Sequence, residues 1–252
     1  MIIPLASLRL SRLSFVVGAI AAATFAGRAV ADPRAVVELF TSQGCSSCPS
    51  ADKVLGDLSR DPSVIALSLP IDYWDYLGWK DTLADTRFSA RQRAYSRMRG
   101  DREVYTPQAV VNGTVHVLGS DRVAIEDAAK STRSNHEVMS VPVSVSQANS
   151  ALTVTVAEGH GAATRGEVWV CAVAKAVPIR IGRGENRGQE VTYHNVVRRW
   201  LKVGDWTGKA GSWSIPLENV KAEGVDAAVV YVQDGNRDQP GPMLGAAMTA
   251  LR

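Results

Sequence analysis

Residues 41–52 read TSQGCSSCPSAD and place two cysteines, Cys45 and Cys48, on either side of two serines. The preceding run, residues 35–41 (AVVELFT), is almost continuously apolar, which is typical of a β-strand buried on both faces. In residues 49–60 the apolar side chains recur at spacings of three, four and seven, which predicts an amphipathic helix. The cysteine pair is therefore expected between a buried strand and the helix that follows it.

This position favours redox chemistry. The free N–H groups and the dipole at a helix start stabilise a thiolate, so the pKa of a thiol there falls and its attack on disulfides becomes faster. A second thiol two residues away can then resolve the mixed disulfide that the first one forms. The pattern predicts thiol–disulfide exchange in which Cys45 attacks and Cys48 resolves.

Three other interpretations of the pair stay open. The pair could form a structural disulfide, although closing so short a loop contributes only about 2 kcal/mol. It could bind copper(I), which needs two or three soft ligands, with His116 as the third; a closed zinc site would need four ligands, and Cys171 lies in the other half of the chain. The motif could also persist on a non-enzymatic binding protein. The histidines show no metal-ligand spacing, and we predict neither a metal site nor a cofactor.

The pattern of apolar residues differs between the two halves of the chain. We expect a strand at residues 64–69, an aromatic loop at 72–79 and a polar helix at 81–99. A hairpin at residues 107–119 and a last helix at 121–131 follow. Asn112-Gly113 between two β-like runs is a strong hairpin signal. From Val141 onward the helical period disappears, and short alternating or apolar runs predict a β-sandwich or small barrel. We therefore expect an α/β domain over residues 32–135, with a mixed four-stranded sheet, and an all-β sandwich-like domain over residues 136–252.

The first half resembles the thioredoxin superfamily. Cys45-Ser46-Ser47-Cys48 follows a buried strand, and Thr106-Pro107 directly precedes the hairpin. The resemblance implies a thioredoxin-like fold, a cis peptide bond at Pro107, and packing of this proline against the cysteines. Thioredoxins also bury an acid on the first strand, and Glu38 is the candidate proton acceptor for Cys48. The chain departs from the pattern at Gly44, where thioredoxins usually carry tryptophan, and at Pro49, which disfavours helical geometry at Cys48.

A narrower resemblance covers nearly all of the chain after its N-terminal segment. The stretches ELFTSQGCSSCPSAD (38–52), DYWDYLGWKD (72–81), YTPQAVVNG (105–113) and GENRGQEVTYHNVVR (184–198) are similar to a family of secreted bacterial proteins known only as a domain of unknown function. This resemblance implies a thioredoxin-like N-terminal domain, a β-rich second half and a location outside the cytoplasm. It implies no established reaction.

Tyr73, Trp74 and Thr106 are candidate substrate-binding residues. The two aromatic residues follow the second strand, at the sheet edge where the cysteines lie and where open α/β sheets bind ligands. They could line a groove for a substrate peptide, or pack beneath their own loop or against the second half. The glycine-rich stretch at residues 182–188 lacks the residues of a phosphate-binding loop and is interpreted as a hairpin loop.

The first 31 residues carry the marks of a secretory signal peptide. Two arginines precede an apolar stretch at residues 13–25, and Ala29-Val30-Ala31 forms an A-x-A end, although an uncleaved anchor is the alternative. This segment holds three of the 28 Lys and Arg residues and no acid, so the remaining chain has 25 basic and 25 acidic residues. That balance favours neither nucleic acid nor an anionic surface, and no other segment is apolar enough to span a bilayer. We expect a secreted or periplasmic protein that acts on thiols or disulfides of exported proteins, together with an unidentified redox partner.

Overall fold

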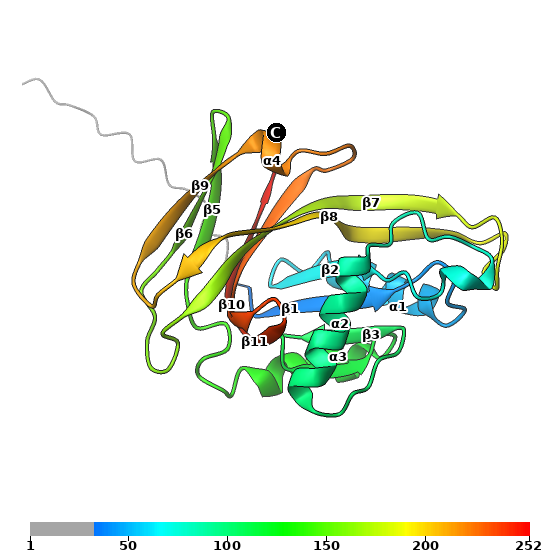
Figure 1. Cartoon of the computed structure of the whole chain (residues 1–252), viewed down its shortest axis with the longest axis horizontal. Helices are drawn as coiled ribbons and strands as arrows, with labels where there is room; N and C mark the ends of the chain where they lie inside the picture. Colours follow the sequence, from blue (N-terminus) through cyan, green and yellow to red (C-terminus); the bar gives the residue numbers. More distant parts are fainter. Residues whose placement is uncertain (1–32) are drawn as a thin grey trace, which may run out of the picture. The chain divides into compact units, whose positions relative to one another are not determined.

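The computed structural model describes residues 33–252, so the predicted signal peptide lies outside the described residues (Figure 1). The first half has the predicted order of strand, helix, strand, helix, strand, strand and helix. Its elements are β1 (Ala35–Thr41), α1 (Cys48–Leu58), β2 (Val64–Pro70), the short 3-10 helix η1 (Asp75–Leu77), α2 (Thr86–Arg99), β3 (Gln108–Val111), β4 (Val115–Leu118) and α3 (Arg122–Thr132). The polar helix begins later than predicted because Asp85 caps it, its side chain accepting a hydrogen bond from the Arg87 N–H.

The four strands of the first half form a mixed sheet. β1 pairs in parallel with β2 and antiparallel with β3, and β3 pairs antiparallel with β4. Residues 112–114 connect β3 to β4, and Asn112 and Gly113 have φ values of 51° and 74°, the positive values that a type I′ turn needs. A Cβ on Gly113 would also lie 2.5 Å from the carbonyl oxygen of Gly241. The predicted hairpin is therefore confirmed.

The second half is rich in β-structure, as predicted. Its elements are β5 (Val143–Ala148), β6 (Ala151–Val156), β7 (Gly166–Arg180), β8 (Glu190–Trp206), β9 (Gly211–Pro216), the short helix α4 (Leu217–Val220), β10 (Ala227–Asn236) and β11 (Gln239–Ala250). A three-stranded sheet, β5-β6-β9, packs its apolar face against β7, β10 and β11 to give a sandwich-like layer (Figure 1).

One large sheet joins the two halves. Its eight strands run in the order β11-β10-β7-β8-β2-β1-β3-β4, so strands from both sides of residue 135 belong to it. β8 meets β2 through a parallel pair at Ser68 and Val196, and the Asn195 side chain donates a hydrogen bond to the Ala66 carbonyl at 2.9 Å. The predicted boundary falls in the connection between α3 and β5, but the sheet itself continues across it.

Alternation along β1 separates two buried layers. Val37 and Leu39 face α1 and α3 in one apolar cluster, whereas Val36 and Phe40 belong to a second cluster with α2 and the aromatic residues of β7, β8 and β10. All seven residues of β1 are buried, which agrees with the predicted strand covered on both faces. A side chain at position 38 therefore points to the α2 side of the sheet.

Candidate functional site

Cys45 and Cys48 are joined by a disulfide at the start of α1. Their Cα atoms lie 5.4 Å apart, and the Cys48 N–H donates to the Cys45 carbonyl at 3.1 Å. Cys48 is the first residue of the helix and is fully buried, whereas Cys45 keeps 4% of its surface exposed. Ser47, whose hydroxyl lies 3.4 Å from Cys45 Sγ, is exposed. Cys45 is therefore the less buried cysteine of the pair.

The segment that carries Cys45 is held in place by the long loop between β7 and β8. Asn186 of this loop is buried, and its side-chain nitrogen donates to the carbonyls of Gln43 at 3.0 Å and Cys45 at 2.8 Å. The glycine-rich stretch at residues 182–188 is therefore a hairpin loop, as predicted. Through Asn186 it holds the backbone of the cysteine segment by two hydrogen bonds, a contact called the Asn186 clamp below. Sequence reasoning missed Asn186, because nothing in the local pattern shows that the loop folds back over residues far away in the chain.

Pro107 lies near α1, and Trp74 lies beside Gly44, the residue before Cys45. The Thr106–Pro107 peptide bond is cis, as the resemblance implied, and Pro107 is buried. A Cβ placed on Gly119 would contact both Pro107 and Ala51 of α1, so the proline packs beside the first turns of that helix.

Trp74 links the aromatic loop to both neighbouring segments. Its Nε1–H donates to the Thr106 hydroxyl at 2.7 Å, and its Cβ lies 3.3 Å from where a side chain on Gly44 would begin. A larger residue at position 44 would therefore press on Trp74. Tyr73 directly precedes Trp74 in this loop; its hydroxyl donates to Gln92 at 3.2 Å, and burial raises its pKa to about 12.

Glu38 is not placed beneath the cysteine pair. It lies on the α2 side of the sheet, where its carboxylate accepts hydrogen bonds from Arg91 at 2.7 and 3.1 Å and from the Tyr95 hydroxyl at 2.5 Å. Both partners of the Glu38–Arg91 ion pair are almost fully buried. The predicted role of Glu38 as proton acceptor for Cys48 does not fit this geometry, because β1 separates its carboxylate from α1.

A different buried acid, Asp52, lies on the cysteine side of the sheet. It follows Cys48 by four residues in α1, so the two side chains project from the same face of the helix one turn apart. Asp52 is 2% exposed, and neither of its carboxylate oxygens has a hydrogen-bond partner within residues 33–252. Burial raises the pKa of this carboxyl to about 8; the nearby Thr41 hydroxyl opposes the shift, and the charge of Asp81 adds to it.

Asp81 connects this acid to the cysteine segment. Its carboxylate accepts hydrogen bonds from the backbone N–H groups of Gln43 and Leu83, each at 2.8 Å, and burial raises its pKa to about 6. Burial is the main cause that raises the pKa of Tyr193 well above its ordinary value, and the charges of Asp52 and Asp81 add to the shift. Sequence reasoning missed Asp52, although an acid four residues after Cys48, on the face that also carries Leu55, was a usable signal.

The other candidate residues are placed elsewhere. The His116 ring forms a hydrogen bond with the Tyr105 hydroxyl at 3.0 Å and lies 3.3 Å from the Asp101 carboxylate. Across residues 33–252, no three His, Cys, Asp or Glu side chains gather in a way that could hold a metal ion. Cys171 is a free, buried cysteine of β7 in the core on the α2 side, and burial raises the pKa of its thiol. None of the helices in the described part of the chain has the length and apolar character needed to cross a membrane.

Comparison with known proteins gives a family and a fold. The crystal structure of protein AGR_C_4864 from Agrobacterium tumefaciens is similar to this chain, with 32% identity and a TM-score of 0.77, over 86% of this chain and 94% of that one. HBP35 of Porphyromonas gingivalis matches in fold alone, with 12% identity and a TM-score of 0.55, over 87% of this chain and 76% of that one. No curated protein matches. Residues 36–233 match the family DUF1223, described as a protein of unknown function, and the chain therefore belongs to that family.

Proposed function

We propose that this protein is a secreted or periplasmic thiol–disulfide oxidoreductase that acts on exported proteins through Cys45 and Cys48. The observation that carries the proposal is the bonded pair at the first turn of α1, with Cys45 less buried than Cys48 and with Pro107 near the helix. The element order of the first half and its strand order β2-β1-β3-β4 support a thioredoxin-like scaffold for this pair.

The oxidised pair can accept electrons from a dithiol. A thiolate of an exported protein attacks Cys45 Sγ, the Cys45–Cys48 bond breaks, and Cys48 leaves as a thiolate. A second thiolate of the same client then attacks the client sulfur of the mixed disulfide. The client disulfide forms, Cys45 leaves as a thiolate, and the protein is reduced by two electrons. A redox partner that supplies a disulfide restores the pair; a partner dithiol would drive the same steps in reverse.

Asp52 supplies the proton that this exchange needs at the buried sulfur. With a pKa of about 8, its carboxyl is mostly protonated at neutral pH. It can therefore donate a proton to the departing Cys48 thiolate, and in the reverse direction its carboxylate accepts the proton from the attacking thiol. Cys48 has no exposed surface, so bulk water cannot readily take this role.

Redox equilibration tests the proposal. The protein is incubated in glutathione buffers of graded oxidation state, and the fraction of the Cys45–Cys48 disulfide is measured by mass spectrometry after alkylation. Insulin reduction and refolding of reduced ribonuclease report turnover in each direction. Activity should be lost in Cys45→Ser and Cys48→Ser and kept in Cys171→Ala, which removes a thiol in a separate core. No turnover in either direction, with a pair that glutathione cannot reduce, would refute the proposal.

Capture of clients gives a second test. A Cys48→Ala variant leaves Cys45 free to form a mixed disulfide that no second thiol resolves. Exported proteins should accumulate in covalent complexes with this variant, and reductant should release them. A Cys45→Ala, Cys48→Ala double variant is the matched control, and it should form no such complexes.

The low exposure of Cys45 favours one other function, a binding protein with a structural disulfide. Only 4% of the Cys45 surface is accessible, and Asn186 fixes the backbone beside it. In that case a partner would be captured equally well by the protein that lacks both cysteines, and removing the disulfide would lower stability without changing affinity. The capture experiment separates the two functions directly.

A further inference from the structure

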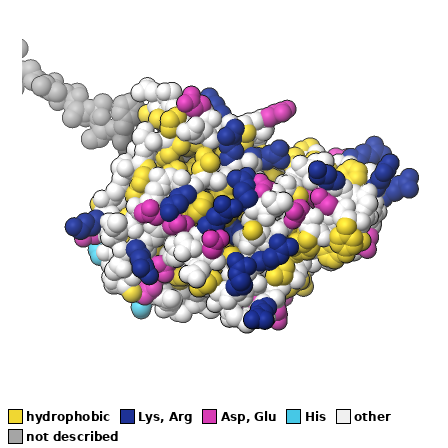
Figure 2. All heavy atoms as spheres, viewed as in Figure 1, with side chains coloured by type: hydrophobic (Ala, Val, Ile, Leu, Met, Phe, Trp, Pro, Cys, Tyr) yellow, Lys and Arg dark blue, Asp and Glu magenta, His cyan; other side chains and the backbone are white. Residues whose placement is uncertain are grey.

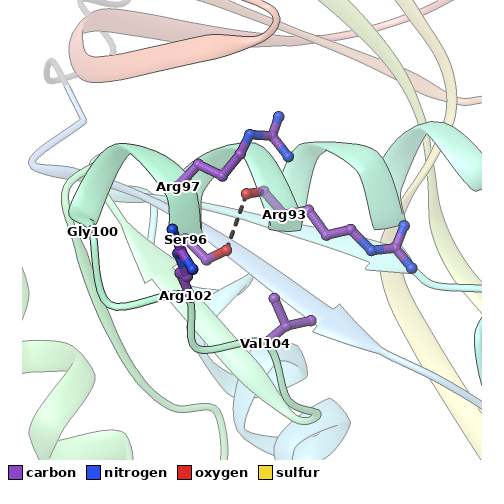
Figure 3. A pocket seen from close by; sticks show the side chains of 6 residues that line it. All are labelled: Arg93, Ser96, Arg97, Gly100, Arg102 and Val104. Carbon is purple, nitrogen blue, oxygen red and sulfur yellow. Dashed lines mark hydrogen bonds between the residues drawn. The ribbon is translucent and has the colours of Figure 1, made fainter.

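A row of arginines lines an open groove beside α2. The groove has a volume of about 680 Å³ and is lined by Arg93, Ser96, Arg97, Gly100, Arg102 and Val104. Figure 3 shows Arg93 and Arg97 projecting from α2 and Arg102 from the loop that follows the helix. A second depression of about 160 Å³ shares Arg93 and Arg97 and adds Arg237 and Trp200. Lys and Arg side chains are also numerous on the face of the molecule seen in Figure 2.

These arginines differ from others in the same region. Arg87, Arg91 and Arg99 each form an ion pair with a carboxylate. Within residues 33–252, no ion pair joins Arg93, Arg97, Arg102 or Arg237 to an acid, and Asp238 is the single acid that lines either depression. Arg93 and Arg97 are exposed and four residues apart on one helix face, where like charges repel. Arg93, Arg97 and Arg102 therefore have no paired acid in the described structure, whereas Arg237 lies close enough to Asp85 to act on it by charge.

Two sets of neighbouring residues connect the groove to Trp74, which packs beside Gly44. The guanidinium of Arg93 lies 5.9 Å from the centre of the Tyr73 ring, and that ring lies 6.0 Å from Trp74, which packs beside Gly44. On the other side, Val104 of the groove lies two residues before Thr106, which accepts the hydrogen bond from Trp74. The Arg93 end of the groove therefore lies next to the aromatic loop, whose Trp74 packs beside the residue that precedes Cys45.

The length of the groove favours a polypeptide over a small anion. The α2 residues that line the groove run from Arg93 to Gly100, about 10 Å along the helix axis. That distance matches about three residues of extended chain, whereas a single phosphate would contact one guanidinium or two. Guanidinium groups pair with carboxylates in a planar, two-bonded geometry, so Asp and Glu side chains along an extended segment suit this row.

We propose that the arginine groove binds an acidic segment of the exported protein whose thiol or disulfide reacts at Cys45. This inference rests on the proposed function, because it assigns to that reaction a class of client. Binding to the groove would hold the client against α2 while its sulfur reaches the cysteine pair, and it would select clients that carry Asp or Glu near a cysteine.

Equilibrium binding tests the groove independently of the redox chemistry. A fluorescent peptide rich in Glu and its Gln-substituted match are titrated with the Cys45→Ala, Cys48→Ala protein, and anisotropy is measured at low and at physiological salt. The acidic peptide should bind more tightly, and R93Q/R97Q should weaken it about tenfold, since each exposed charge pair contributes modestly. Arg165→Gln, an exposed arginine outside the groove, is the matched control and should have no effect.

The outcomes separate the inference from the proposed function. Equal binding of the two peptides, or no effect of R93Q/R97Q, would overturn the inference even if the protein catalyses exchange. Binding of inorganic pyrophosphate or of vesicles with anionic lipid, without binding of the acidic peptide, would overturn it in favour of another occupant. If acidic peptides bind, an acidic disulfide peptide should also exchange with Cys45 about tenfold faster than its Gln match, and R93Q/R97Q should remove that advantage.

Discussion

Replacing Asp52 with asparagine should change how folding stability depends on pH. Asp52 is fully buried and its carboxylate lacks a hydrogen-bond partner among the described residues, so the charged form is disfavoured in the folded protein. The folded pKa of about 8 lies above the ordinary value of 3.8. The sign follows from linkage: stability that is present below pH 3.8 is lost as pH rises through the folded pKa.

The magnitude can be worked from these two values. Between them, stability falls by about 1.4 kcal/mol for each pH unit, because the unfolded chain releases a proton that the folded protein retains. From pH 5 to pH 7 the wild-type protein should therefore lose about 2.5 kcal/mol that the Asp52→Asn variant does not lose. The difference between two pH values matters here, since any fixed cost of burying the asparagine amide cancels.

Urea unfolding, followed by tryptophan fluorescence with the disulfide intact, measures the effect at several pH values. Asp81, whose pKa is also raised, is present in both proteins, so its contribution largely cancels. Asp127→Asn removes an exposed acid of α3 and serves as the control, which should follow the wild type. If wild type and Asp52→Asn show the same pH dependence between pH 5 and pH 8, Asp52 is charged in the folded protein, and its role as proton donor to Cys48 fails with it.

Three further predictions concern other parts of the molecule. Asn186→Ala removes two hydrogen bonds to the cysteine segment, so we expect a loss of about 2 kcal/mol in unfolding free energy and faster alkylation of Cys45 after reduction; unchanged alkylation would show that the clamp does not control access. Glu38→Gln leaves the buried Arg91 without its counter-charge and should lower stability by about 3 kcal/mol, while exchange at the folded pair persists, as urea unfolding and the glutathione assay would report. Export of the full chain should yield a mature protein beginning at Asp32, and a mass that still includes residues 1–31 would support an uncleaved anchor.

The sequence predicted the elements whose signals are local. The apolar run of β1, the spacing of apolar residues in α1 and the Asn112-Gly113 turn each depend on neighbours within a few residues, and each is found where expected. The resemblance to thioredoxins also implied the cis bond before Pro107, which the structure contains. The hairpin pairing of β3 with β4 could be inferred for the same reason, whereas the pairing of β1 with β3 followed only from the expected closure of a mixed sheet.

Features that depend on distant residues could not be predicted in this way. β8 joins β2 through residues more than a hundred positions apart, so the shared sheet has no local signal. Glu38 was assigned to the cysteines because it lies on the first strand, but which face it occupies depends on register, and Arg91 lies 53 residues later. The charge balance of the chain also hid the arginine groove, since a net charge carries no information about where charges gather.

The two buried acids on either side of β1 differ in one respect that bears on function. Glu38 has a counter-charge and a hydroxyl partner, so its burial is compensated and its place in the fold explains its presence. Asp52 has no counter-charge, and the Thr41 hydroxyl near it offsets only part of the cost of burial, so its carboxyl lowers stability wherever it is ionised. A residue that weakens the fold at neutral pH, one helical turn from a buried sulfur, is best explained by the proton that the sulfur must gain or lose. If Asp52→Asn proved more stable at pH 8 yet exchanged disulfides with an unchanged rate and pH profile, this explanation would be wrong.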